Sequence, residues 1–104
     1  MRKNRQGEMD MDNRVLMETI LRVERMECSF DALESAFEND PASIGTDAAL
    51  QALLRGLKWY YEGGQWLKDY KTDENGFLPM NLKRGVLSED GVYDLFSSLD
   101  ALGE

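Results

Sequence analysis

The chain has 104 residues, 42% of them hydrophobic, and a formal net charge of −8 at pH 7, a balance that is typical of one small soluble domain and argues against binding to a phosphate backbone. It contains no histidine and a single cysteine, Cys28, which excludes the usual general base, the commonest zinc ligand and an internal disulfide. No apolar run approaches the length of a membrane span or a signal-peptide core. We therefore expect a cytoplasmic protein that binds neither nucleic acid nor membranes.

The first eleven residues, MRKNRQGEMDM, show no hydrophobic periodicity and contain three basic side chains and a glycine. This composition predicts a disordered N-terminal tail over residues 1–11 and a single helical domain over residues 12–104. A small basic docking tail is the alternative.

A long amphipathic helix should follow the tail. Asp12 or Asn13 can act as its N-cap. Apolar side chains then recur in steps of three and four, which predicts one helical face: Leu16, Ile20, Val23, Met26, Phe30, Leu33 and Phe37. Pro41 disfavours the helical conformation at Asp40 and cannot continue the hydrogen-bond ladder, so the helix should end near Asn39.

A second helix is predicted after a tight connection at residues 41–46. Ser43 or Thr46 could cap it. Its one-sided apolar stripe consists of Leu50, Leu53, Leu54, Leu57 and Tyr61. Gly63 and Gly64 should end the helix, and the two apolar faces should meet in an antiparallel helical hairpin.

A short third helix and a turn should come next. Trp66 and Tyr70 lie about one helical turn apart within residues 65–70, which is enough for a short helix. The sequence Asp73-Glu74-Asn75-Gly76 is typical of a tight turn.

An irregular segment over residues 77–86, called the strap below, is predicted beyond that turn. Pro79 and Gly85 disfavour regular structure there, so the apolar side chains of the strap should hold it on the hairpin. Lys83 and Arg84 should then point outward or toward acids on other elements.

Ser88 is predicted to cap the last helix, because a serine directly before Glu89 and Asp90 can accept a hydrogen bond from the first helical turn, where acids favour the helix dipole. Leu87 and Val92 would then form a hydrophobic staple. The helix has one apolar face, made of Val92, Leu95, Phe96, Leu99 and Leu102. The predicted fold is all-α: a long antiparallel hairpin, a short third helix, an irregular strap and a C-terminal amphipathic helix.

The C-terminal half carries long, irregular motifs, which read Trp59-Tyr60-Tyr61, Trp66-x-x-Asp69-Tyr70 and Leu82-Lys83-Arg84-Gly85-Val86-Leu87-Ser88-Glu89-Asp90. Over roughly residues 15–100 the chain resembles an uncharacterised family of small bacterial proteins, a domain of unknown function. The resemblance implies a bacterial cytosolic origin and supplies no active site.

Acidic side chains line one edge of the first helix: Glu24, Glu27, Asp31, Glu34 and Glu38. Like charges four residues apart cost an isolated helix about 0.2–0.5 kcal/mol per pair. Cations on neighbouring elements should therefore form ion pairs with some of these acids, and the candidates are Arg55, Lys58 and Lys68. A docking edge for a basic partner is one alternative. A Mg²⁺ or Mn²⁺ site is another, which the second helix disfavours because Glu62 is its only acid.

No metal site or cofactor is predicted. With Gly76 at the sixth position of a calcium loop, the first ligand would be Lys71 and the last Leu82, and neither binds the ion. Cys28 lacks a histidine that could activate it, so we expect it to be inert.

Six aromatic residues fall within twenty positions: Trp59, Tyr60, Tyr61, Trp66, Tyr70 and Phe77. In one interpretation they seal the open end of the hairpin under the strap. In the other they form an aromatic pocket, whose candidate binding residues are Trp59, Tyr61, Trp66, Asp69, Tyr70, Lys83 and Arg84. Arg84 could instead pair with Asp69 or Asp94 and lock the strap.

The function expected from these patterns is that of a cytoplasmic interaction or regulatory protein without catalytic residues, which recognises partners through its aromatic and strap region. A small carboxylate-based enzyme or a binder of an anionic small molecule is the alternative. Leu16, Ile20 and Val23 begin the apolar face of the first helix beyond the reach of the second helix, so a homo-oligomer is expected, with an unidentified protein as another possible partner.

Overall fold

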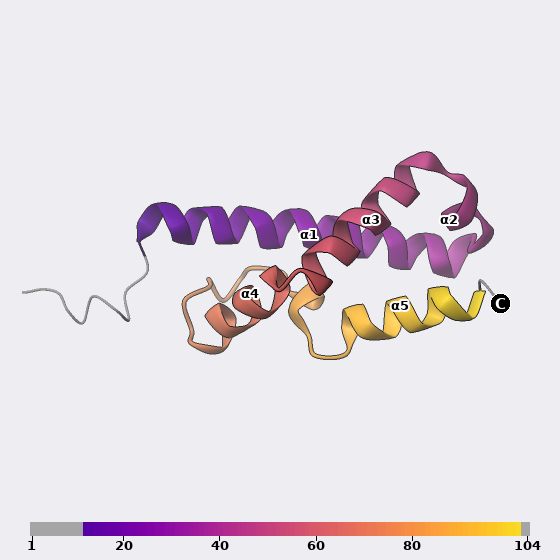
Figure 1. Ribbon diagram of the computed structural model, residues 1–104. Coiled ribbons are helices and arrows are strands. Elements are labelled where there is room, and N and C mark those ends of the chain that lie inside the picture. The colour runs from indigo at the N-terminus through magenta and orange to yellow at the C-terminus, as the bar shows by residue number, and fades with distance from the viewer. Residues whose placement is uncertain (1–11, 103–104) are drawn as a thin grey trace, which may run out of the picture.

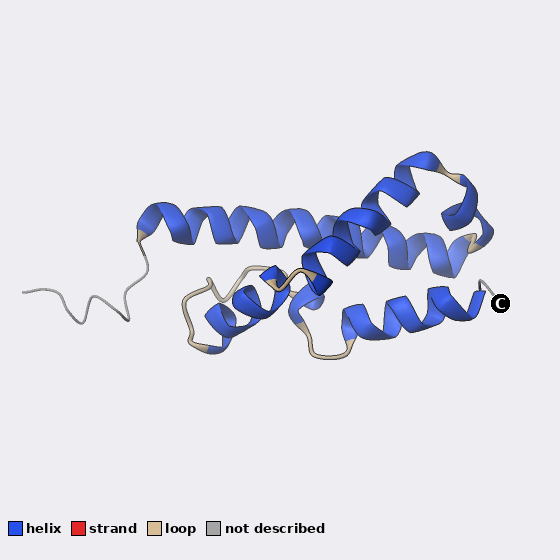
Figure 2. Cartoon of the chain, viewed as in Figure 1, coloured by secondary structure: helices blue, strands red, loops and turns tan. Residues whose placement is uncertain are grey.

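A computed structural model describes residues 12–102, and all regular structure in this range is helical (Figures 1 and 2). The all-α prediction is therefore confirmed. The elements are α1 (Asn13–Asn39), α2 (Ala42–Thr46), α3 (Ala48–Glu62), α4 (Gln65–Glu74), the 3₁₀ turn η2 (Gly85–Leu87) and α5 (Gly91–Leu102). Across residues 12–102 no helix is both long and apolar enough to cross a membrane. The tail predicted for residues 1–11 lies outside the described residues.

Local signals set the bounds of α1. The Asp12 carboxylate accepts a hydrogen bond of 2.7 Å from the Arg14 N–H and so caps the helix. The helix ends at Asn39, as predicted from Pro41. Between these ends, buried side chains recur at Val23, Phe30 and Leu33 on the face that meets the other helices.

The connection between α1 and α3 differs from the prediction. Residues 42–46 form the short helix α2, and Asp47 caps α3 by accepting hydrogen bonds from the Ala49 N–H at 2.8 Å and the Leu50 N–H at 3.2 Å. The Ser43 and Thr46 hydroxyls instead donate to backbone carbonyls within or just before α2. Neither caps α3, because Asp47, directly before Ala48, occupies the N-cap position.

Helix α4 is longer than predicted. It runs to Glu74, so Asp73 and Glu74 are helical and only Asn75 and Gly76 remain for the turn. Gly76 has φ of 81°, a left-handed conformation that ends helices at little cost when the residue is glycine.

The core lies where α3, the strap, η2 and α5 meet the middle of α1. Figure 1 shows α3 crossing α1, with α4 and α5 on the lower side of the pair. The buried apolar residues are Val23, Phe30, Leu33, Leu57, Tyr60, Leu78, Val86, Leu87, Val92 and Leu95. Leu16, Ile20 and Val23 were expected to need cover beyond the second helix. Val23 is buried in this core, and Leu16 and Ile20 are partly buried and pack against it.

Helix α5 begins at Gly91, three positions after Ser88. The Ser88 hydroxyl oxygen accepts a hydrogen bond of 3.1 Å from the Gly91 N–H, and Ser88 itself has an extended backbone with φ of −67° and ψ of 149°. Ser88 therefore has the backbone conformation and the hydrogen bond of an N-cap residue. Glu89 and Asp90, which were predicted to lie in the first turn of the helix, instead form the turn before α5. Val92 and Leu95 then point into the core.

Candidate functional site

Three of the predicted binding residues, Tyr61, Trp66 and Tyr70, are half-buried and pack against one another. Trp66 stacks on Tyr70 with ring centroids 5.1 Å apart, and Tyr61 meets Trp66 edge-on at 5.1 Å and Phe96 at 5.7 Å. The indole N–H of Trp66 donates to the Val86 carbonyl at 2.8 Å. These contacts connect α3, α4, α5 and η2 and so stabilise the packing of these elements.

Trp59 does not join that cluster. It lies on the outward face of α3 and is 77% exposed. The predicted group of aromatic binding residues is thus divided between a half-buried cluster and one exposed side chain.

Asp69 is also removed from the surface. It is 1% exposed, and its carboxylate accepts hydrogen bonds from Arg22 Nε at 2.9 Å, Arg22 Nη2 at 2.8 Å, the Tyr60 hydroxyl at 2.7 Å and Gln65 Nε2 at 3.1 Å. The hydrogen bond to Asp69 raises the pKa of Arg22. Burial of the phenol, and then its hydrogen bond to the Asp69 carboxylate, raise the pKa of Tyr60. Asp69 is therefore the centre of a polar network that joins α1, α3 and α4.

The two cations of the strap are engaged as well. Arg84 forms an ion pair with Asp73 and donates to the carbonyls of Pro79 and Leu82. The prediction that it pairs with Asp69 or Asp94 was wrong, because the extension of α4 brings Asp73 within its reach. Lys83 pairs with Asp31 across 3.4 Å, and both side chains are largely exposed. The seven predicted residues are not gathered around one pocket.

A groove does open between α1 and the strap. It has a volume of about 440 Å³ and is lined by Glu24, Glu27, Cys28, Asp31, Asn81, Leu82 and Lys83. One wall is therefore the acidic edge of α1, and the other is the irregular segment that Arg84 holds in place. We call this the acidic groove.

Glu27 is unlike the other acids of this groove. It is only 7% exposed, and its Oε1 accepts a hydrogen bond of 2.7 Å from the Val86 N–H. Within residues 12–102 its other oxygen, Oε2, accepts no hydrogen bond, and the carboxylate forms no ion pair. Gly85 leaves room for it, because a Cβ on that residue would lie 3.3 Å from Oε2. A buried carboxylate with one unpartnered oxygen is costly unless a cation or donor reaches it.

The surrounding charge is negative. Burial, and then the like charges of Asp31, Glu38 and Glu27, raise the pKa of Glu34. Among residues 12–102, Lys83 is the cation that forms an ion pair with this acidic edge, through Asp31. Arg55, Lys58 and Lys68 form no such pair within that range, contrary to the prediction.

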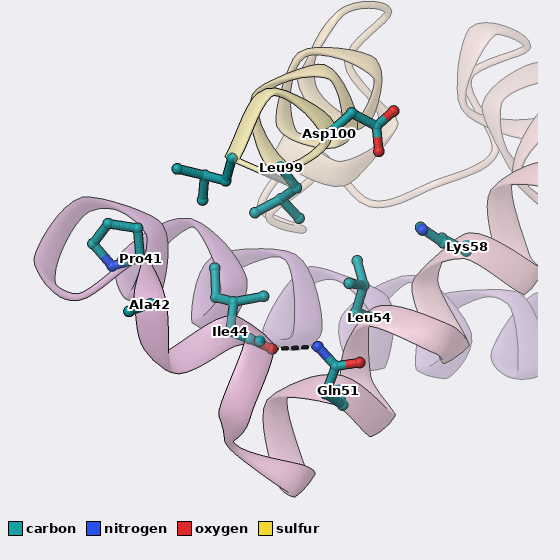
Figure 3. A pocket seen from close by; sticks show the side chains of 10 residues that line it. Pro41, Ala42, Ile44, Gln51, Leu54, Lys58, Leu99 and Asp100 are labelled. Atoms are coloured by element: carbon teal, nitrogen blue, oxygen red, sulfur yellow. Dashed lines mark hydrogen bonds between the residues drawn. The ribbon is translucent and has the colours of Figure 1, made fainter. Parts of the chain in front are cut away.

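A second cavity lies between α2, α3 and α5 and has a volume of about 550 Å³ (Figure 3). Its walls are mainly apolar and include Ile44, Leu54 and Leu99, while Lys58 and Asp100 stand at one end. The Gln51 side chain that borders it donates to the Ile44 carbonyl. This cavity offers apolar contact without the converging charge of the acidic groove.

Across residues 12–102, no three acidic or cysteine side chains lie close enough together to hold a metal ion. The carboxylates of the acidic groove are spread along α1, whereas Mg²⁺ and Ca²⁺ require several oxygens around one point.

Comparison with known proteins identifies the family. Residues 23–103 match the sequence profile described as "Domain of unknown function (DUF4298)". The chain belongs to this family. The resemblance inferred from the motifs, a domain of unknown function, is thereby confirmed. The part of the chain matched as DUF4298 contains every residue of the acidic groove, from Glu24 to Lys83. No curated protein and no solved structure matches the chain.

Local sequence patterns in the DUF4298 chain did not indicate the partners of Glu27 and Arg22. Glu27 was assigned to the acidic edge, but it is also four residues after Val23 and three before Phe30, which places it within the apolar face. No local pattern marks Arg22, because its partner Asp69 lies 47 residues further along the chain.

Proposed function

We propose that this DUF4298 protein is a non-catalytic interaction protein of the cytoplasm, and that its acidic groove binds a basic segment of a partner protein. The observation that supports this most is Glu27, a buried residue of the groove lining whose carboxylate has one oxygen that accepts no hydrogen bond within residues 12–102. An arginine side chain of the partner is the occupant whose chemistry fits best.

The guanidinium group suits the groove for three reasons. It is always charged, it is weakly hydrated and so tolerates partial burial, and its planar set of donors can reach more than one carboxylate. Glu24 and Asp31 lie on the same edge of α1 as Glu27. The arginine stem would contact Leu82 while its head group contacts these acids.

Lys83 would act at the rim of the groove. Its pair with Asp31 spans 3.4 Å between two exposed side chains, and exposed pairs of this kind contribute only about 0–1 kcal/mol. An incoming arginine can displace it at small cost. The net charge of −8 favours encounter with a basic partner as well.

The alternative of an anionic ligand has weaker support. It relied on Lys83 and Arg84, and these cations are paired with Asp31 and Asp73. A cytoplasmic location rests on the single cysteine, Cys28, which is free and exposed and is typical of proteins in reducing compartments.

Fluorescence anisotropy with a labelled peptide tests this function. The probe is a short peptide with two arginines around a leucine, and the control peptide has citrulline, a neutral isostere, in place of both arginines. The first should bind with micromolar affinity and the second about tenfold or more weakly. Equal binding of the two peptides would refute recognition of the guanidinium group.

Matched variants locate the site. Glu27→Gln keeps the size of the side chain and an acceptor for the Val86 N–H, but removes the charge, so it should weaken binding of the arginine peptide about tenfold. Glu38→Gln removes an exposed acid of α1 outside the groove and should change the affinity for the arginine peptide less than about twofold. If the two variants weaken binding equally, the attraction is diffuse and the groove is not a site. Tight stoichiometric uptake of Mg²⁺ or Ca²⁺ in calorimetry would assign the groove to a metal instead.

A further inference from the structure

The outward face of α3 presents a large apolar side chain to solvent. α3 turns Leu57 and Tyr60 into the core, and Trp59 lies on the other side with 77% of its surface exposed. Tryptophan buries more apolar surface than most side chains and is enriched at the centres of protein interfaces. Trp59 has the character of an interface anchor that no pocket within residues 12–102 accommodates.

The residues beside this ring leave space for another helix. Ala52 and Gly56 precede Trp59 by about two turns and one turn of α3, and both are exposed. A Cβ placed on Gly56 would meet no atom within 4 Å, so nothing on the described chain covers this position. Small side chains at a contact reduce the distance between two helix axes.

The charges on the same face are arranged symmetrically about the ring. Arg55 lies about one turn before Trp59, and Glu62 lies about one turn after it. Both are exposed, and neither forms an ion pair within residues 12–102. Along α3 this face carries a positive charge, then an aromatic ring, then a negative charge. When an identical helix packs on it in the antiparallel direction, each charge therefore lies opposite a charge of the other sign.

We propose that a second copy of this chain binds here, with the two α3 helices antiparallel about a two-fold axis near Trp59. Under that rotation, Arg55 of each copy faces Glu62 of the other, so the interface contains this ion pair twice. The two Trp59 rings lie side by side at the axis. The proposal is independent of the acidic groove, which is formed by α1 and the strap.

One helix face from each copy makes a small interface. Specific interfaces at the low end of the size range bury about 1,200 Å² or less in total and are often weak. The dimer should therefore dissociate in the micromolar range and be observable only when the protein is concentrated.

Sedimentation equilibrium of the full chain tests the dimer over concentrations from about 5 to 500 µM, a range that brackets a micromolar dissociation constant. The average mass should rise from 11.9 kDa toward twice that value. Trp59→Ala should keep the chain monomeric over this range. Tyr93→Ala is the matched control, because it removes an aromatic side chain that is 60% exposed on α5. A wild-type mass that stays at 11.9 kDa throughout would overturn the proposal.

Charge reversal tests the antiparallel pairing itself. Arg55→Glu or Glu62→Arg alone would place like charges at both contacts and should raise the dissociation constant about tenfold or more. An equimolar mixture of the two single variants should dimerise as well as wild type, because each contact in the mixed dimer joins opposite charges. The double variant should recover for the same reason. Dimerisation by the single variants at wild-type strength, or failure of the mixture to recover, would overturn the arrangement.

Discussion

The Tyr60 hydroxyl donates a hydrogen bond of 2.7 Å to Oδ2 of Asp69, and the two residues are 2% and 1% exposed. Arg22 binds the same carboxylate from α1 through two nitrogens. Burial, and then the hydrogen bond to Asp69, raise the pKa of Tyr60 above its ordinary value of 10.0. One buried carboxylate thus connects three helices and keeps a tyrosine neutral.

Tyr60 should make the protein lose stability in alkaline solution. Below about pH 10 the phenol is neutral in both the folded and the unfolded chain, so its contribution is fully present. Above that pH the unfolded chain releases the proton while the folded chain retains it, and the free energy of unfolding should fall by about 1.4 kcal/mol per pH unit until the raised pKa is passed.

Urea denaturation between pH 8 and pH 11 checks this expectation, with Tyr60→Phe showing a shallower loss than wild type. Tyr93→Phe is the control, because Tyr93 is 60% exposed and its removal should leave the wild-type slope. If Tyr60→Phe keeps the full alkaline loss, the buried phenol is not its cause.

Asp69→Asn should destabilise the fold strongly. The asparagine keeps the shape of the side chain, but it leaves the Arg22 guanidinium without its counter-charge and offers the Tyr60 hydroxyl a weaker acceptor. Because the Arg22 side chain is 26% exposed, water offsets part of the loss, and we expect a cost of about 2–4 kcal/mol in the free energy of unfolding. Asp31→Asn, in the exposed pair with Lys83, should cost less than about 1 kcal/mol by the same urea measurement. Equal costs would mean that burial of the Arg22–Asp69 pair has no consequence.

Arg84 should be required for order in the strap. Its guanidinium contacts Asp73 and the carbonyls of Pro79 and Leu82, and a lysine cannot reproduce a planar set of donors. Arg84→Lys should therefore cost about 1–3 kcal/mol and speed amide hydrogen exchange in residues 77–84. Lys83→Ala is the neighbouring control and should leave exchange in the strap unchanged. Normal protection in Arg84→Lys would show that apolar side chains alone hold this segment.

Ser88→Ala should cost about 0.5–2 kcal/mol, the range for losing an N-cap side chain. The variant removes the acceptor that the Gly91 N–H uses at 3.1 Å. Ser97→Ala, at an exposed position within α5, should be close to neutral. Thermal or urea unfolding of both variants measures this cost. An unchanged midpoint for Ser88→Ala would mean that water replaces the hydroxyl without a loss of stability.

The sequence was sufficient to predict where α1 begins and where α1 and α3 end. Asp12, Pro41 and the Gly63-Gly64 pair act on backbone groups within a few residues of themselves, so their effects follow from local sterics and hydrogen bonds. Helix α2 and the last turn of α4 were missed because hydroxyl and carboxylate side chains suit both turns and helix ends. Asp47 was overlooked as a cap for that reason.

The tertiary structure alone decided which side chains meet. Arg22 and Asp69 are 47 residues apart in the chain, and Glu27 and Val86 are 59 apart, so no local pattern pairs them. Spacing along α1 placed Glu27 on an acidic edge, but only the docking of η2 against that helix buries it and forms the groove. Likewise, the aromatic residues near Trp59 could be counted in the sequence, whereas the rotation of α3 about its axis, fixed by packing Leu57 and Tyr60 into the core, determines that Trp59 faces solvent.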